Sequence, residues 1–124
     1  MKTPFFLISF GDFTVTKRLF FYEKNGTCML PVFNEPIIAS RFMKDIMERM
    51  RELGDERLLT LQICHNPDSA IEMFTVIMTY ITDLRYVVIN PVLSESEDLT
   101  DITEFYTSLQ SNVRNDVISP SDSK

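Results

Sequence analysis

Apolar residues gather in short runs near the N-terminus of the chain. Residues 4–10 and 13–23 are rich in Phe, Leu, Ile, Val and Thr, and Gly11-Asp12 between them is a turn candidate. Apolar runs that are bounded by turn residues are typical of β-strands. We therefore expect two N-terminal strands joined by a short turn.

The clearest local signal is the dipeptide Asn25-Gly26. Asn-Gly between apolar runs favours a type I′ hairpin turn, because both residues can adopt a positive φ. A two-residue loop at this point predicts that Tyr22 lies opposite Met29. Pro31 has no N–H to donate, so the returning strand is expected to lie at an edge or to be nearly finished there.

Residues 35–53 have the periodicity of an amphipathic helix. Asn34 is a suitable N-cap, Pro36 fits the first turn, and Gly54 suits the left-handed position that follows a helix. Five apolar residues form one stripe along this helix: Ile38, Phe42, Ile46, Met50 and Leu53.

The middle of the chain predicts a strand and a second helix. Leu and Ile alternate with Thr and Gln over residues 58–64, which is the pattern of a strand. A helix over 67–84 follows, with Asn66 as its N-cap and Pro67 at its first position.

The last third of the chain predicts a short buried strand over 86–89 and a third helix over 98–112. Asp98 and Asp101 are expected at the N-terminus of that helix, where negative charge is favoured. The acidic segment around them lacks the spacing and the glycine of a calcium loop, so no metal site is predicted.

These elements together predict an α+β fold in a single domain over residues 1–111. An N-terminal β-hairpin continues into a mixed sheet of about five strands, with two or three helices packed mainly on one face. Residues 112–124 are expected to be a disordered acidic, Ser-rich tail. The predicted core consists of apolar residues from all of these elements: Leu19, Phe21, Leu30, Val32, Phe42, Ile46, Leu59, Leu61, Ile63, Phe74, Ile77, Ile81, Val87 and Ile89.

Asparagine precedes proline at three passages out of a strand. If these strands are parallel, the asparagines lie along one carboxyl edge of the sheet, where open α/β sheets usually bind ligands. This edge is a candidate small-ligand site formed by Asn34, His65, Asn66 and Asn90. Helix starts also prefer Asn and Pro, so capping is the alternative explanation.

The 67–84 helix is apolar around most of its circumference. A helix of this kind is usually buried, and the sheet and the other helices could enclose it. Alternatively, Met73, Val76, Met78 and Tyr80 contribute to an exposed interface, because Met and Tyr are enriched at such surfaces.

Composition restricts the class of protein. The 124 residues include 12 Lys and Arg against 18 Asp and Glu, a net charge of −6 that argues against a nucleic-acid partner. The uncharged stretch 73–82 is half of the roughly 20 residues that a membrane helix needs, and the apolar N-terminus has no cleavage site. Cys28 and Cys64 form no metal-binding pair, so we expect reduced, packed thiols and a cytoplasmic protein without membrane contact.

No catalytic, cofactor or metal site is predicted. Cys64 and His65 are neighbours at a strand end and point to opposite faces, which does not suit a nucleophile and its base. The three glycines are isolated, so phosphate-binding loops are absent from the sequence, and so is a Gly-x-Ser-x-Gly motif. We therefore expect a protein that is not an enzyme and needs no cofactor.

Two short motifs resemble the N-terminal domain of SseB-type proteins. In that family a Pro-Val-Phe strand end, here residues 31–33, precedes the first helix, and a hydrophobic strand ends in Asn-Pro, here Asn90-Pro91. The resemblance covers residues 18–110 and implies an α+β fold without established catalytic residues. The chain differs from the family in its longer N-terminal strands and in lacking a glycine after Asn90-Pro91.

The sequence thus predicts a non-enzymatic protein-interaction or regulatory domain. The alternative is a small-ligand-binding or catalytic domain that uses the edge at Asn34, Asn66 and Asn90. The predicted partner is a protein, either another chain or a second copy in a homodimer. Self-association is expected through the second helix or through the strand at 5–10, which has no charge or proline to block its edge.

Overall fold

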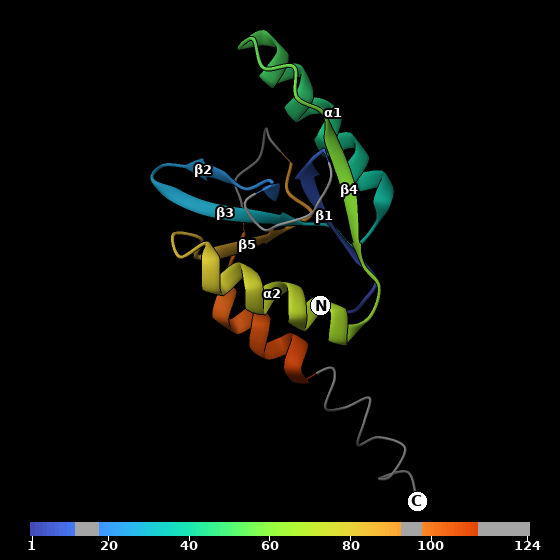
Figure 1. The fold of residues 1–124 in the computed structure, drawn as a ribbon, viewed down its shortest axis with the longest axis vertical. Coiled ribbons are helices and arrows are strands. Elements are labelled where there is room, and N and C mark those ends of the chain that lie inside the picture. The colour runs from blue at the N-terminus through green and yellow to red at the C-terminus, as the bar shows by residue number, and fades with distance from the viewer. Residues whose placement is uncertain (12–17, 93–97, 112–124) are drawn as a thin grey trace, which may run out of the picture.

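The strand β1 (Phe5–Phe10) lies in the middle of the fold and connects its two sheets. The computed structural model describes residues 1–11, 18–92 and 98–111. The predicted α+β class and the mixed sheet are confirmed (Figure 1). The other elements are β2 (Tyr22–Lys24), β3 (Thr27–Val32), α1 (Pro36–Glu52), β4 (Leu59–Cys64), α2 (Pro67–Tyr80), β5 (Tyr86–Ile89), β6 (Leu99–Asp101) and a helix over residues 102–111.

The strands form two sheets where the sequence predicted one. β1 pairs antiparallel with β4, and the second sheet has the order β2-β3-β5-β6, in which β3 and β5 are parallel. Phe6 and Phe33 join the sheets, because each backbone N–H donates to the other's carbonyl, at 2.7 and 2.9 Å. β1 also contacts the chain at Leu19, which lies opposite Ser9. Residues 12–17, where the predicted turn after β1 falls, lie outside the described residues.

The predicted hairpin at Asn25-Gly26 is confirmed. Asn25 has φ 55° and Gly26 has φ 78°, as a type I′ turn requires at both positions. Tyr22 lies opposite Met29, in the predicted register. Pro31 sits one residue before the end of β3, so the prediction that the strand is nearly finished there is confirmed. The alternative of an edge position is wrong, because β3 pairs with both β2 and β5.

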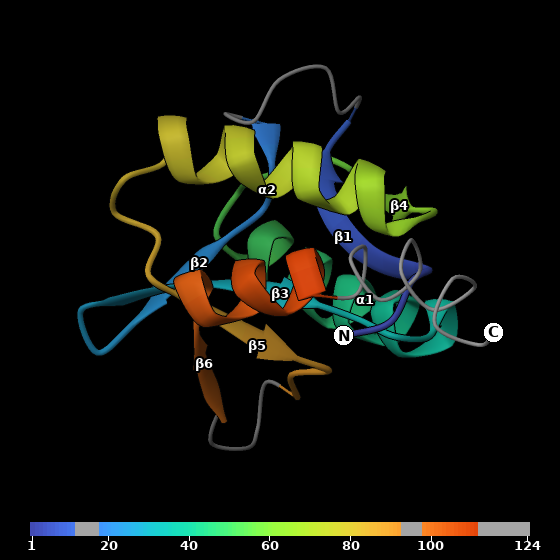
Figure 2. The same ribbon diagram turned by 90° about the horizontal axis from the view of Figure 1, so that it is seen from below.

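The helices cover both faces of β1. Phe5 and Leu7 point into the hydrophobic cluster beneath α2 and the 102–111 helix, whereas Phe6 and Ile8 point into the cluster beneath α1. Figures 1 and 2 show α1 on one side of the strands and the other two helices side by side on the opposite side. Two of the three helices therefore share a face, and α1 covers the other.

Three predicted helix boundaries differ from the structure. Glu35, not Asn34, is the N-cap of α1, and it makes no side-chain capping bond. α2 ends at Tyr80 and not at residue 84, because the chain has to turn before β5 begins at Tyr86. Leu99 belongs to β6 and not to a helix, because its strand pairs with the free side of β5.

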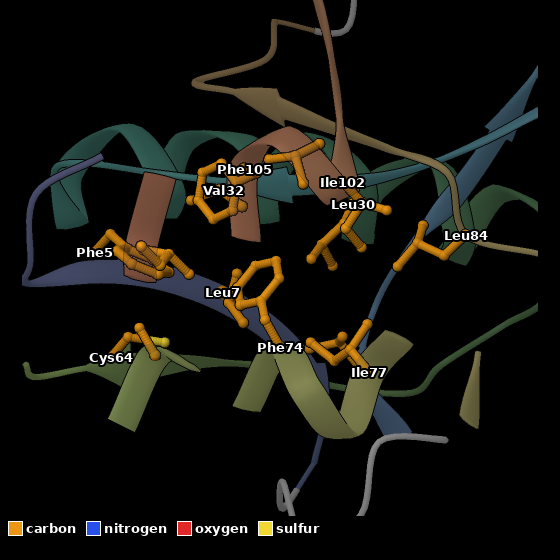
Figure 3. Close-up of a cluster of buried hydrophobic side chains, with 14 residues drawn as sticks. Phe5, Leu7, Leu30, Val32, Cys64, Phe74, Ile77, Leu84, Ile102 and Phe105 are labelled. Atoms are coloured by element: carbon orange, nitrogen blue, oxygen red, sulfur yellow. The ribbon is translucent and has the colours of Figure 1, made fainter. Parts of the chain in front are cut away.

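Most of the predicted core is buried, and Figure 3 shows its larger cluster. Phe21, Leu61 and Ile81 are only half-buried. Ile63 and Ile89 are 43% and 41% exposed, so their placement in the core is wrong. Ile63 is in the outer strand β4, and Ile89 is the last residue of β5, where the covering layer ends. The buried predictions are Leu19, Leu30, Val32, Phe42, Ile46, Leu59, Phe74, Ile77 and Val87.

Candidate functional site

The ends of β3 and β5 are linked by a pair of asparagines. The Asn34 backbone N–H donates to Asn90 Oδ1 over 3.1 Å, and Asn90 Nδ2 donates to Asn34 Oδ1 over 3.0 Å. This link explains why Asn34 does not cap α1. Asn90 has φ 52°, a left-handed conformation that Asn tolerates better than most residues. The side-chain oxygens of both asparagines therefore accept hydrogen bonds within the pair, which we call the asparagine clasp. The clasp links the ends of β3 and β5 and leaves fewer polar atoms free to bind a ligand.

The other two residues of the predicted ligand edge take different roles. Asn66 caps α2 as predicted, because its Oδ1 accepts the backbone N–H of Ser69 over 2.9 Å. His65 is exposed. Phe6 lies opposite Ile63 on one side and Phe33 on the other, so β3 and β4 do end at the same edge. Among the described hydrogen bonds, none joins Asn66 or His65 to the asparagine pair.

The asparagine clasp can be tested by two substitutions of Asn90. Asn90→Gly keeps the positive φ and removes both hydrogen bonds, so we expect a loss of about 1 kcal/mol in the free energy of unfolding. Asn90→Val adds the strain of a β-branched residue in the left-handed region, which raises the expected loss to about 2–3 kcal/mol. Urea unfolding measures both, and equal losses would contradict the assigned strain.

The predicted interface residues on α2 separate into two groups. Met73, Val76 and Tyr80 are spaced by three and four residues and therefore lie on one stripe, which we call the α2 stripe. Val76 is 41% exposed and Tyr80 is 74% exposed, whereas Met73 is half-buried. Met78 is half-buried against the core on the other flank of the helix. Ala70, Phe74 and Ile77 form the buried face, so the helix is neither fully enclosed nor fully exposed.

A contact with the 102–111 helix shows which side of α2 is covered. The hydroxyl groups of Thr75 and Tyr106 are 2.8 Å apart and share a hydrogen bond. At 100° per residue, Thr75 lies on the opposite flank of α2 from Met73. The neighbouring helix therefore covers the flank away from the α2 stripe.

Cys64 lies where β4 meets the α2 stripe. Its thiol is buried and lies 3.7 Å from the sulfur of Met73. Burial away from water raises the pKa of Cys64 to about 12, because desolvation disfavours the thiolate. A nucleophilic cysteine needs a lowered pKa, so Cys64 has the wrong environment for catalysis. Both Cys28 and Cys64 are free thiols, as the sequence predicted.

No family model and no curated protein matches the chain. The resemblance to SseB-type proteins therefore stays a prediction. None of the helices in the described ranges has the length and apolar character that crossing a bilayer demands.

A shallow depression at the opposite end of the sheet was not predicted. It has a volume of about 400 Å³ and lies beside the hairpin turn, between Glu23, Cys28, Asp83, Arg85 and Tyr86. Its lining comes from two separate segments, residues 23–28 and 83–86, and carries both signs of charge, so no sequence motif marks it. Within residues 1–11, 18–92 and 98–111, no group of three His, Cys, Asp or Glu side chains is placed to hold a metal ion. Part of the acidic segment near residue 95 lies outside the described residues, and Asp101 accepts the Thr103 N–H over 2.8 Å at the start of the last helix.

Proposed function

We propose that this protein is a non-enzymatic protein-interaction domain whose partner binds the α2 stripe. The observation that carries the proposal is the exposure of Val76 and Tyr80 next to Met73 on one side of α2. Tyrosine and methionine are enriched in the cores of protein interfaces, and a tyrosine ring adds a large contact area with one polar end. A small-ligand site at the asparagine edge has less support, because Asn34 and Asn90 bond to each other.

The chemistry of the stripe indicates the kind of partner. The side chains along it are apolar or uncharged, so the matching surface on a partner is an apolar groove or helix face. Glu72 is exposed one helical turn before Val76, Asp83 is exposed three residues beyond the end of α2, and the chain carries a net charge of −6. A basic rim around that apolar surface would favour association.

A single substitution on the stripe tests this proposal. Tyr80→Glu puts a charge on the most exposed residue of the stripe, at its C-terminal end, and should reduce binding of a native-lysate partner at least about tenfold. Gln110→Glu is the control, because Gln110 is exposed on the 102–111 helix, which covers the flank of α2 away from the stripe. We expect the control to retain the same partner as the wild type, in a quantitative affinity-capture measurement.

The same experiment can reject the proposed function. Both variants should keep the wild-type melting temperature, because both positions are exposed. If Tyr80→Glu retains every protein that the wild type and Gln110→Glu retain, the α2 stripe is not the contact surface.

A further inference from the structure

β4 is an outer strand without the usual protection of a sheet edge. It pairs with β1 on one side, and in the described part of the chain no strand pairs with its other side. Edge strands are normally blocked by charges, prolines or bulges, because open N–H and C=O groups attract other strands. β4 is six residues long and contains none of these charges or prolines.

Hydrogen bonds around β1 show which backbone groups of β4 face outward. The Gly11 N–H donates to the Leu58 carbonyl over 3.0 Å, and bonded pairs alternate along an antiparallel ladder. Thr60, Gln62 and Cys64 therefore bond to β1. The backbone groups of Phe6 and Ile8 bond to Phe33 and Phe20, on the side of β1 that faces away from β4, which agrees with this alternation. The outward N–H and C=O groups consequently belong to Leu59, Leu61 and Ile63.

The charge distribution also leaves this edge open. Residues 58–64 carry no charged side chain, although the chain has a net charge of −6. Just before the strand, Arg57 forms a 2.7 Å ion pair with Asp55, and the exposed Glu56 between them lies outside the paired segment. That hydrogen bond lowers the pKa of Asp55, and the Arg57 guanidinium also stacks on Phe10, 4.2 Å from the ring centre. Two copies of this strand can therefore approach without bringing like charges together.

We propose that a second copy of this chain pairs antiparallel across the β4 edge and continues the sheet through a two-fold axis. Residues that lie directly opposite each other share a face of a sheet. A two-fold axis perpendicular to the sheet also keeps each residue on the same face in both copies. A strand that pairs antiparallel with its own copy therefore has one residue that lies opposite the same residue of the second copy. With Leu61 at the axis, Leu59 lies opposite Ile63 of the second copy. This is the register in which all three outward-facing residues find backbone partners.

The proposed register also covers apolar surface. Leu59, Leu61 and Ile63 point to the α1 face of the sheet, and Ile63 is 43% exposed in the single chain. In the proposed dimer these three residues of one copy lie beside the same three of the second copy, so all six form one apolar row. A six-residue ladder buries less than the roughly 800 Å² per partner of a stable interface, so the expected dimer is weak, with a dissociation constant on the order of 10 μM. This proposal does not depend on the α2 stripe.

Hydrogen exchange measured by NMR, together with sedimentation equilibrium, tests the pairing directly. Between roughly 10 μM and 1 mM we expect the mass to rise towards that of a dimer. Over the same range the amides of Leu59, Leu61 and Ile63 should exchange about tenfold more slowly. The amides of Thr60, Gln62 and Cys64 should be protected at every concentration, because they bond to β1. A constant monomer mass, or a dimer in which the three outward amides still exchange fast, would overturn the proposal.

Two lysine substitutions of similar exposure distinguish this edge from the α2 stripe. Ile63→Lys places a charge in the apolar row and should weaken dimerisation at least about tenfold. Val76→Lys, at a residue that is 41% exposed on α2, should leave the dimer unchanged. If Val76→Lys weakens the dimer and Ile63→Lys does not, the two copies associate through the α2 stripe and not through the β4 edge. Ile63→Lys should still bind a partner of the α2 stripe, so the two proposals fail separately.

Discussion

Replacing Phe74 with alanine is expected to lower the free energy of unfolding by about 3–5 kcal/mol, the range for a large aromatic residue removed from a core. Phe74 is fully buried, and its ring centre lies 4.9 Å from that of Phe105 and 6.2 Å from that of Phe5. These three rings join α2, the 102–111 helix and β1 (Figure 3). The loss therefore affects three elements at once.

Denaturant unfolding measures this effect, with Tyr80→Ala as the control on the same helix. Tyr80 is 74% exposed, so its removal should change the free energy of unfolding by less than about 1 kcal/mol. A typical domain is stable by only about 5–15 kcal/mol, so Phe74→Ala should remove a large part of the total. A loss below about 1 kcal/mol for Phe74→Ala would mean that this cluster does not hold the fold together.

Alkylation of Cys64 at pH 8 should be slower in the folded protein by about three orders of magnitude than in the unfolded chain. Only the thiolate reacts, and a pKa of about 12 leaves about one thiol in ten thousand ionised, against about one in ten at the ordinary value of 9.0. Mass spectrometry after iodoacetamide treatment, with and without denaturant, measures the ratio. Cys28, which is half-buried, should be modified first.

The same thiol makes stability depend on alkaline pH. Folding favours the neutral form of Cys64, so its contribution to stability is complete below about pH 9. Above this value the unfolded chain ionises first, and the contribution is lost as the pH rises towards about 12. Cys64→Ala should have a flatter stability profile between pH 9 and 11. An identical decline in both proteins would assign the effect to other groups.

Local features of the fold follow from the sequence because they depend on neighbouring residues. The Asn25-Gly26 turn needs only two residues that tolerate positive φ, and it forms as predicted. Asn66 and Pro67 start α2 in the same way, because the cap accepts an N–H three residues away. The strand β5 begins and ends where the apolar run does.

Predictions fail where a distant segment competes for a residue. Asn34 is of a residue type that is favoured at N-caps, yet it bonds to Asn90, which is 56 residues away in the chain. Leu99 fits a helical pattern, but β5 offers it a strand to pair with. The strand at 5–10 has an unprotected sequence, yet it lies between β4 and the contacts at Leu19 and Phe33, so the prediction of an open edge there is wrong.

The candidate interaction surfaces show the same division. The sequence by itself determined the α+β class, the hairpin turn, the presence of three helices and the apolar character of α2, since each follows from periodicity or from turn and cap chemistry. The tertiary structure alone decided that β4 is an outer strand, that the α2 stripe is exposed and that Met78 lies apart from it. Exposure depends on which segments pack together, and long-range pairings such as Phe6 with Phe33 and Ile63 have no periodic signal in the chain.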